Sequence, residues 1–67
     1  MSVEPTARDI VFSHLIEQED KIAWTVDEMV SECNERVSRY TVRNTFNSLT
    51  SLGVMNHKSG SPYWYFL

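Results

Sequence analysis

The sequence predicts an α+β fold, mainly α, in which three helices precede a C-terminal β-hairpin. Three observations predict it. Apolar residues recur at three- and four-residue spacings in three segments, which is typical of helices packed on one side. Two of these segments begin at a threonine followed three residues later by an acid. Residues 54–67 contain two β-prone runs around a Ser-Gly-Ser-Pro break. With 67 residues the chain is expected to form one domain, 6–67, after an N-terminal tail, 1–5.

The first helix is expected to begin after Thr6 and to run to about Glu19. Thr6 and Asp9 have the spacing of a capping box, in which each side chain binds the other residue's backbone amide. Phe12 and Ile16 lie beside the expected inward face. The residues of that face recur every three or four positions: Ile10, Val11, His14, Leu15 and Gln18.

Residues 22–24 form a short apolar run, long enough for one β-bridge but too short for a sheet of its own. Thr25 and Glu28 repeat the capping-box spacing, so a second helix is expected from there to about Cys33. A helix of this length depends on packing for its stability. Asn34 is expected to end it in the left-handed conformation.

Ser38 is the expected cap of the third helix, which ends at Gly53. Its apolar stripe has steps of four, three and three: Val42, Phe46, Leu49 and Leu52. The alternating residues 54–67 then predict the hairpin, so the expected order is α-β-α-α-β-β.

The charges are segregated along the chain, whose net charge is −3. Residues 1–35 hold two bases against all nine acids, whereas residues 36–67 hold four bases and no acid. The absence of acids from residues 36–67 suggests that the surface of this half of the chain faces a polyanion.

Three segments resemble the winged helix-turn-helix domains of small bacterial and archaeal transcription regulators. They are Thr25–Met29, which opens the second helix, Val37–Arg43, which opens the third, and Leu49–Val54, which leads into the hairpin. The resemblance covers about residues 7–67. It implies a DNA-binding transcriptional regulator in which helix 38–52 reads the major groove of double-stranded DNA. The hairpin, 54–67, would act as a wing at the backbone or minor groove.

The apolar stripe of helix 38–52 faces the core, so the opposite side of this helix is left to contact DNA. Arginine can pair bidentately with guanine, and asparagine with adenine. Instead of contacting DNA, Arg36 could form an ion pair with Glu32, one helical turn earlier. The wing offers one base, whereas winged domains often carry two or more. The candidate DNA-binding residues are Arg36, Ser38, Arg39, Tyr40, Thr41, Arg43, Asn44, Asn47 and Lys58.

The main alternative is a winged-helix module that binds a protein rather than DNA, which the acidic first half favours. An enzyme is not expected, because two glycines cannot supply a phosphate-cradling loop and so short a chain has little room for a pocket. No metal or cofactor is expected, since His14, His57 and Cys33 lie far apart in the sequence. No apolar stretch suits a membrane span and no signal peptide is evident, so a cytoplasmic location is expected.

The aromatic run at residues 63–67 raises the question of a partner. In a strand, Trp64 and Phe66 share one face while Tyr63, Tyr65 and Leu67 share the other. Only one of these faces can pack on the helices. A homodimer is therefore a hypothesis, through this strand as an apolar edge or through the first helix.

Overall fold

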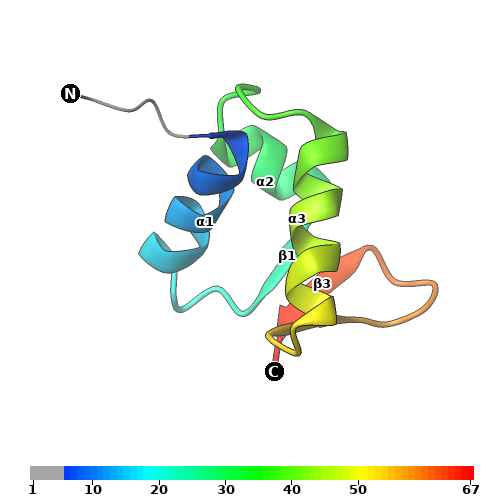
Figure 1. The fold of residues 1–67 in the computed structure, drawn as a ribbon. Helices are drawn as coiled ribbons and strands as arrows, with labels where there is room; N and C mark the ends of the chain where they lie inside the picture. Colours follow the sequence, from blue (N-terminus) through cyan, green and yellow to red (C-terminus); the bar gives the residue numbers. More distant parts are fainter. Residues whose placement is uncertain (1–5) are drawn as a thin grey trace.

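The computed structural model describes residues 6–67, and the expected tail, 1–5, lies outside the described residues. The fold class and the element order predicted from the sequence are confirmed. Three helices surround a common core, and a small sheet closes one end of it (Figure 1). The elements are α1 (Ala7–Glu17), β1 (Ala23–Thr25), α2 (Val26–Glu32), α3 (Arg39–Ser51), β2 (Met55–His57) and β3 (Tyr63–Phe66).

Both predicted capping boxes are present. Thr6 Oγ1 accepts from the Asp9 amide and Asp9 Oδ2 accepts from the Thr6 amide, each at 3.2 Å. At α2 the corresponding distances are 3.0 Å for the Glu28 amide and 2.9 Å for the Thr25 amide. Each box satisfies two backbone donors that the first turn of a helix leaves without partners.

The turn between α2 and α3 ends α2 by a Schellman motif. Asn34 adopts the left-handed conformation as predicted (φ 52°), and Glu35 adopts it as well (φ 59°), which the sequence did not indicate. The Glu35 amide donates to the Val30 carbonyl at 3.1 Å, and the Asn34 amide donates to the Ser31 carbonyl at 3.0 Å. The same pair of bonds ends α3, where Gly53 is left-handed (φ 80°).

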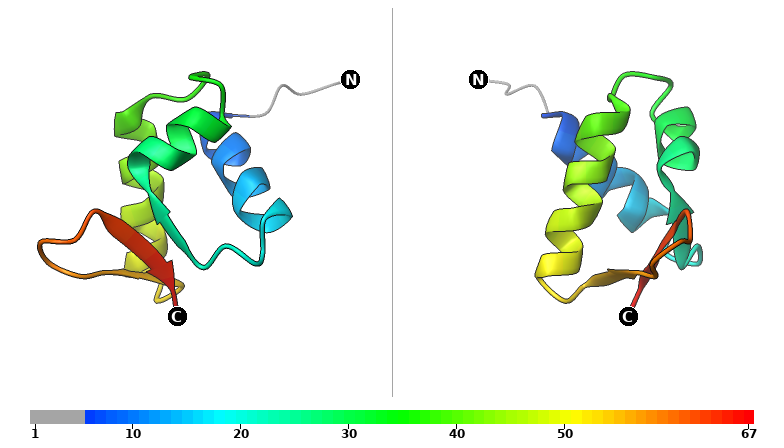
Figure 2. Two further views of the ribbon diagram at one scale, coloured as in Figure 1. Left: turned by 180° about the vertical axis from the view of Figure 1, so that it is seen from behind. Right: turned by 90° about the vertical axis from the view of Figure 1, so that its right-hand side faces the viewer.

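The three strands form an antiparallel sheet in the order β1-β3-β2, so the aromatic strand is central. Trp64 pairs with Trp24 on one side and with His57 on the other. The short run near residue 23 is therefore an edge strand of three residues. β3 has no free edge, so the expectation of an apolar edge at this strand is wrong. Figure 2 shows the loop between β2 and β3 projecting past the side of α3.

The core lies between the helices and the sheet. Val42, Phe46 and Leu49 are buried as predicted, together with Thr45, whose hydroxyl donates to the Thr41 carbonyl at 2.8 Å. Leu52 was expected on the same stripe, but it is 76% exposed because it is the C-cap, after which the chain turns away. The other buried apolar residues are Val11, Leu15, Trp24, Val26, Met29, Cys33, Val37, Met55 and Trp64. Within residues 6–67, no helix has both the length and the apolar character that crossing a membrane requires.

Candidate nucleic-acid interface

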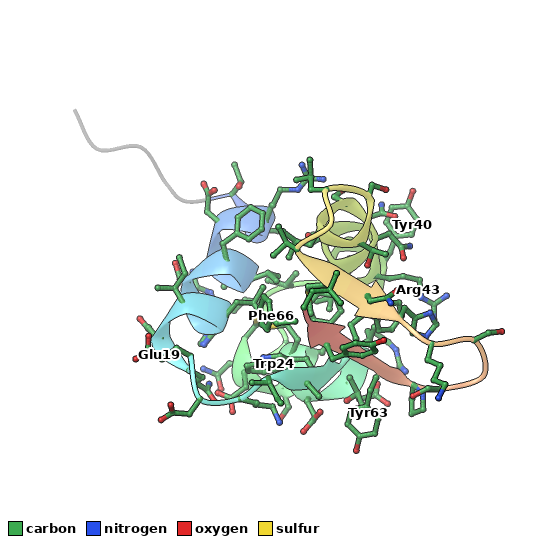
Figure 3. All side chains as sticks on the ribbon, turned by 90° about the horizontal axis from the view of Figure 1, so that it is seen from below. Glu19, Trp24, Tyr40, Arg43, Tyr63 and Phe66 are labelled. Carbon is green, nitrogen blue, oxygen red and sulfur yellow. The ribbon has the colours of Figure 1, made fainter. Side chains whose placement is uncertain are left out.

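The outward face of α3 carries the polar residues that the sequence placed there. Five predicted residues of the helix are exposed: Arg39, Tyr40, Arg43, Asn44 and Asn47. They are exposed because the intervening positions of the same helix are buried in the core. Arg43 and Tyr40 lie on the side from which the hairpin loop projects, whereas Glu19 lies on the opposite side (Figure 3). The exposed side of α3 and the hairpin loop thus lie on the same side of the protein.

Ser38 and Thr41 take part in the start of α3. Ser38 Oγ accepts from the Thr41 amide at 3.1 Å and donates to Thr41 Oγ1 at 3.0 Å. The Ser38 side chain therefore holds the first turn of the helix. Ser38 itself is exposed and Thr41 is half-buried, so Ser38 is the more accessible of these two predicted residues.

Arg39 has an ion-pair partner from another helix. Its Nη2 lies 2.6 Å from Oδ1 of Asp27, in the first turn of α2, and both side chains are about 70% exposed. This acid was not predicted beside α3, because Asp27 precedes the acid-free half of the chain and only the packing of α2 on α3 brings it there. The surface around α3 is therefore less positive than its own residues suggest.

A cleft of about 450 Å³ separates α3 from the hairpin. The α3 side contributes Arg39, Arg43 and Asn47, each four residues after the last. The other side is formed by residues of the hairpin and of the start of α2: Thr25, Val26, Asp27, His57, Ser61, Pro62 and Trp64. The α3 side offers hydrogen-bond donors, whereas the opposite side combines hydroxyl and carboxylate oxygens with the apolar surface of Val26, Pro62 and Trp64.

His57 fixes the hairpin beside this cleft. Its ring stacks on Trp64 with centroids 4.0 Å apart and planes 12° apart. Its Nε2 lies 2.6 Å from the Ser61 carbonyl oxygen, and because a carbonyl only accepts, Nε2 carries the proton. The Ser61 amide donates to the Lys58 carbonyl at 3.0 Å, with Gly60 in the turn at φ 82°. From the sequence, His57 was considered as a metal ligand, and its stacking on Trp64 was not predicted.

The remaining two predicted residues do not line the cleft. Lys58 is exposed at the hairpin loop, and Arg36 is exposed in the turn between α2 and α3. The ion pair of Arg36 with Glu32 that the spacing allows is not formed; the ion pairs of residues 6–67 are Arg39–Asp27 and Lys21–Glu28. Both Arg36 and Lys58 thus keep their charges accessible to solvent.

Cys33 and the histidines form no metal centre in the described part of the chain, where no three His, Cys, Asp or Glu residues gather. Cys33 is buried in the core, as its place in the second helix predicted. Burial raises the pKa of the Cys33 thiol, and the nearby Glu32 carboxylate raises it further. The thiol therefore stays protonated near neutral pH, the form that suits a small apolar residue.

Comparisons with protein families, with curated proteins and with solved structures found no match to this chain.

Proposed function

We propose that the protein is a DNA-binding transcriptional regulator of the winged helix-turn-helix type. In this proposal α3 enters the major groove and the β2–β3 hairpin is the wing. The observation that carries it is the row formed by Arg39, Arg43 and Asn47 on the exposed side of α3, facing the hairpin across the cleft.

The row is arranged along a helix of a kind that the major groove admits. Asn47 lies eight positions after Arg39, which corresponds to about 12 Å along the helix at a rise of about 1.5 Å per residue. The major groove is about 12 Å wide, enough for an α-helix with its side chains. Arg39 and Arg43 can pair bidentately with guanine, and Asn47 with adenine, so the row combines residues that read bases.

The hairpin supports a second contact beside the groove. Lys58 is exposed on the loop that projects past α3, at a position suited to a phosphate or to the minor groove. Arg36, exposed in the turn before α3, would contact the phosphate backbone. These two residues would position the helix, and the row on α3 would supply specificity.

The second candidate is a protein-binding module, and two observations favour it. Asp27 compensates the charge of Arg39, and Tyr40 is 74% exposed beside that pair. Exposed tyrosine and arginine are enriched in the centres of protein interfaces. DNA binding accounts better for the charges of residues 36–67. This half of the chain has four bases and no acid, and all four bases are exposed.

The test is fluorescence anisotropy with a labelled random-sequence duplex at low salt. Arg43→Ala is the informative variant, because Arg43 is exposed and has no ion-pair partner among residues 6–67. Lys21→Ala removes a charge of the same sign from the turn before β1 and also breaks the Lys21–Glu28 ion pair, so it shows what a loss of charge and stability away from α3 does to binding. Loss of affinity by Arg43→Ala alone, with unchanged circular dichroism, supports the proposal. Absence of binding by the wild type at low salt excludes it and favours the protein-binding module.

A further inference from the structure

An apolar groove lies between α1, the end of α3 and the end of the sheet. It has a volume of about 230 Å³ and almost no polar surface. The residues that line it are Phe12, Leu15, Ile16, Leu49, Val54 and Phe66. Figure 1 shows α1 and the hairpin loop on opposite sides of α3, so this groove does not form part of the cleft beside the hairpin.

Three exposed apolar side chains lie on this groove or next to it. Ile16 is 75% exposed on its wall, and Val54, also on its wall, is 43% exposed. Leu67 follows Phe66 and is 76% exposed, with its amide bonded to the Val54 carbonyl at 3.1 Å. Contiguous exposed apolar residues of this kind mark contact surfaces.

The charges along α1 indicate what covers this groove. Arg8 precedes Phe12 by one turn and Glu19 follows Ile16 by three residues, so a base and an acid flank the apolar pair. Figure 3 shows Glu19 beyond the last turn of α1. When two such helices lie antiparallel, Phe12 of each faces Ile16 of the other, and Arg8 of each faces Glu19 of the other. A parallel arrangement places Glu19 against Glu19 instead.

We infer that the groove binds a second copy of this chain, with the two α1 helices antiparallel across a twofold axis near Ser13 and His14. This surface is complementary to itself, as a twofold interface requires. A standard interface buries about 800 Å² on each partner, which is about one sixth of the 4834 Å² surface of this chain.

The dimer does not depend on DNA binding, because it uses the side of the protein away from the hairpin loop. It leaves the exposed row of α3 open in both copies. If the proposed function holds, the twofold axis predicts a DNA site with two symmetric halves. Sedimentation measures the dimer without DNA, so absence of the dimer can be distinguished from absence of DNA binding.

The first experiment is sedimentation velocity of the whole chain up to about 1 mM, a range that detects even a millimolar Kd. The wild type is expected to sediment at twice the mass of one chain. Ile16→Lys is expected to weaken association at least about tenfold, since it buries a charge in an apolar contact. Tyr40→Lys is the matched control, because Tyr40 is 74% exposed on the other side of the protein. A wild-type monomer over the whole range overturns the proposal.

The second experiment tests the antiparallel pairing by charge reversal. Arg8→Glu and Glu19→Arg are each expected to weaken the dimer several-fold, and the double variant is expected to restore it. These residues are exposed, so neither change removes a core contact. A dimer that is indifferent to both single changes, or a double variant weaker than either, overturns this arrangement of the helices.

Discussion

The carboxylate of Asp27 lies 2.6 Å from the guanidinium of Arg39 and joins the first turn of α2 to the first turn of α3. Both residues line the cleft between α3 and the hairpin. The ion pair gives the proposed base-reading helix a fixed negative neighbour. Asp27 therefore sets how readily Arg39 can turn toward a phosphate or a base.

Replacing Asp27 by Asn is expected to raise the affinity for random-sequence DNA about three- to tenfold at low salt. The change frees Arg39 and removes a charge that repels phosphates, which corresponds to about 0.7–1.4 kcal/mol. It also removes an acid from the first turn of α2, so stability is expected to fall by about 0.5 kcal/mol. Anisotropy titration and thermal unfolding measure the two effects.

Asp20→Asn is the control for this variant, because it removes the same charge from the turn before β1. It is expected to leave DNA affinity within about twofold of the wild type. If Asp27→Asn instead weakens binding, the carboxylate holds Arg39 in the orientation that DNA requires.

Much of the fold could be predicted from the sequence because its signals are local. A capping box needs only two residues at a fixed spacing, and Thr6 with Asp9 and Thr25 with Glu28 form both boxes. The periodicity of α3 identified Val42, Phe46 and Leu49 as buried and Arg43 as exposed. The same periodicity wrongly predicted that Leu52 is buried, because α3 ends there and the helical spacing no longer applies.

What could not be predicted depends on contacts between distant segments. The central place of β3 required knowing that residues 23–25 pair with it. The position of Asp27 beside Arg39 required the packing of α2 on α3. The stacking of His57 on Trp64 required the register of the hairpin. None of these relationships has a spacing in the sequence that distinguishes it from other pairings.

DNA affinity is expected to fall with salt along a shallow slope. Arg36, Arg39, Arg43 and Lys58 are the bases near α3 and the hairpin, so at most four phosphates are neutralised. The slope of log K against log salt is then between about −2 and −3.6, at about −0.9 for each phosphate. Arg43→Ala should make it less negative by about 0.9. A slope near zero for the wild type would contradict a phosphate-bound complex.

Acid should destabilise the protein through Glu28. A hydrogen bond from Lys21, at 2.8 Å, and the Thr25 amide hold the pKa of Glu28 below its usual value of 4.5. A lowered pKa in the folded state gives stability that is present above the unfolded value and is lost as pH falls through the folded one. Glu28→Gln retains the acceptor for the Thr25 amide but not the charge.

The melting temperature of the wild type is therefore expected to fall more steeply than that of Glu28→Gln as pH decreases below about 4.5. Lys21→Ala should flatten the wild-type dependence in the same way, because it removes the main cause of the shift. If the melting temperatures of the wild type and both variants fall in parallel as pH decreases, the protonation of Glu28 is not linked to folding.

Glu35→Gly is expected to stabilise the protein by about 0.5–1 kcal/mol. Glu35 has φ 59°, a conformation that costs a residue with a side chain about 1–2 kcal/mol, whereas glycine adopts it freely. The greater freedom of glycine in the unfolded chain offsets part of this gain. Glu32→Gly, inside α2, removes the same charge but should destabilise by about 1 kcal/mol, because φ is helical there. Urea unfolding of the two variants measures both changes, and destabilisation by Glu35→Gly would mean that its side chain makes a contact worth more than the strain.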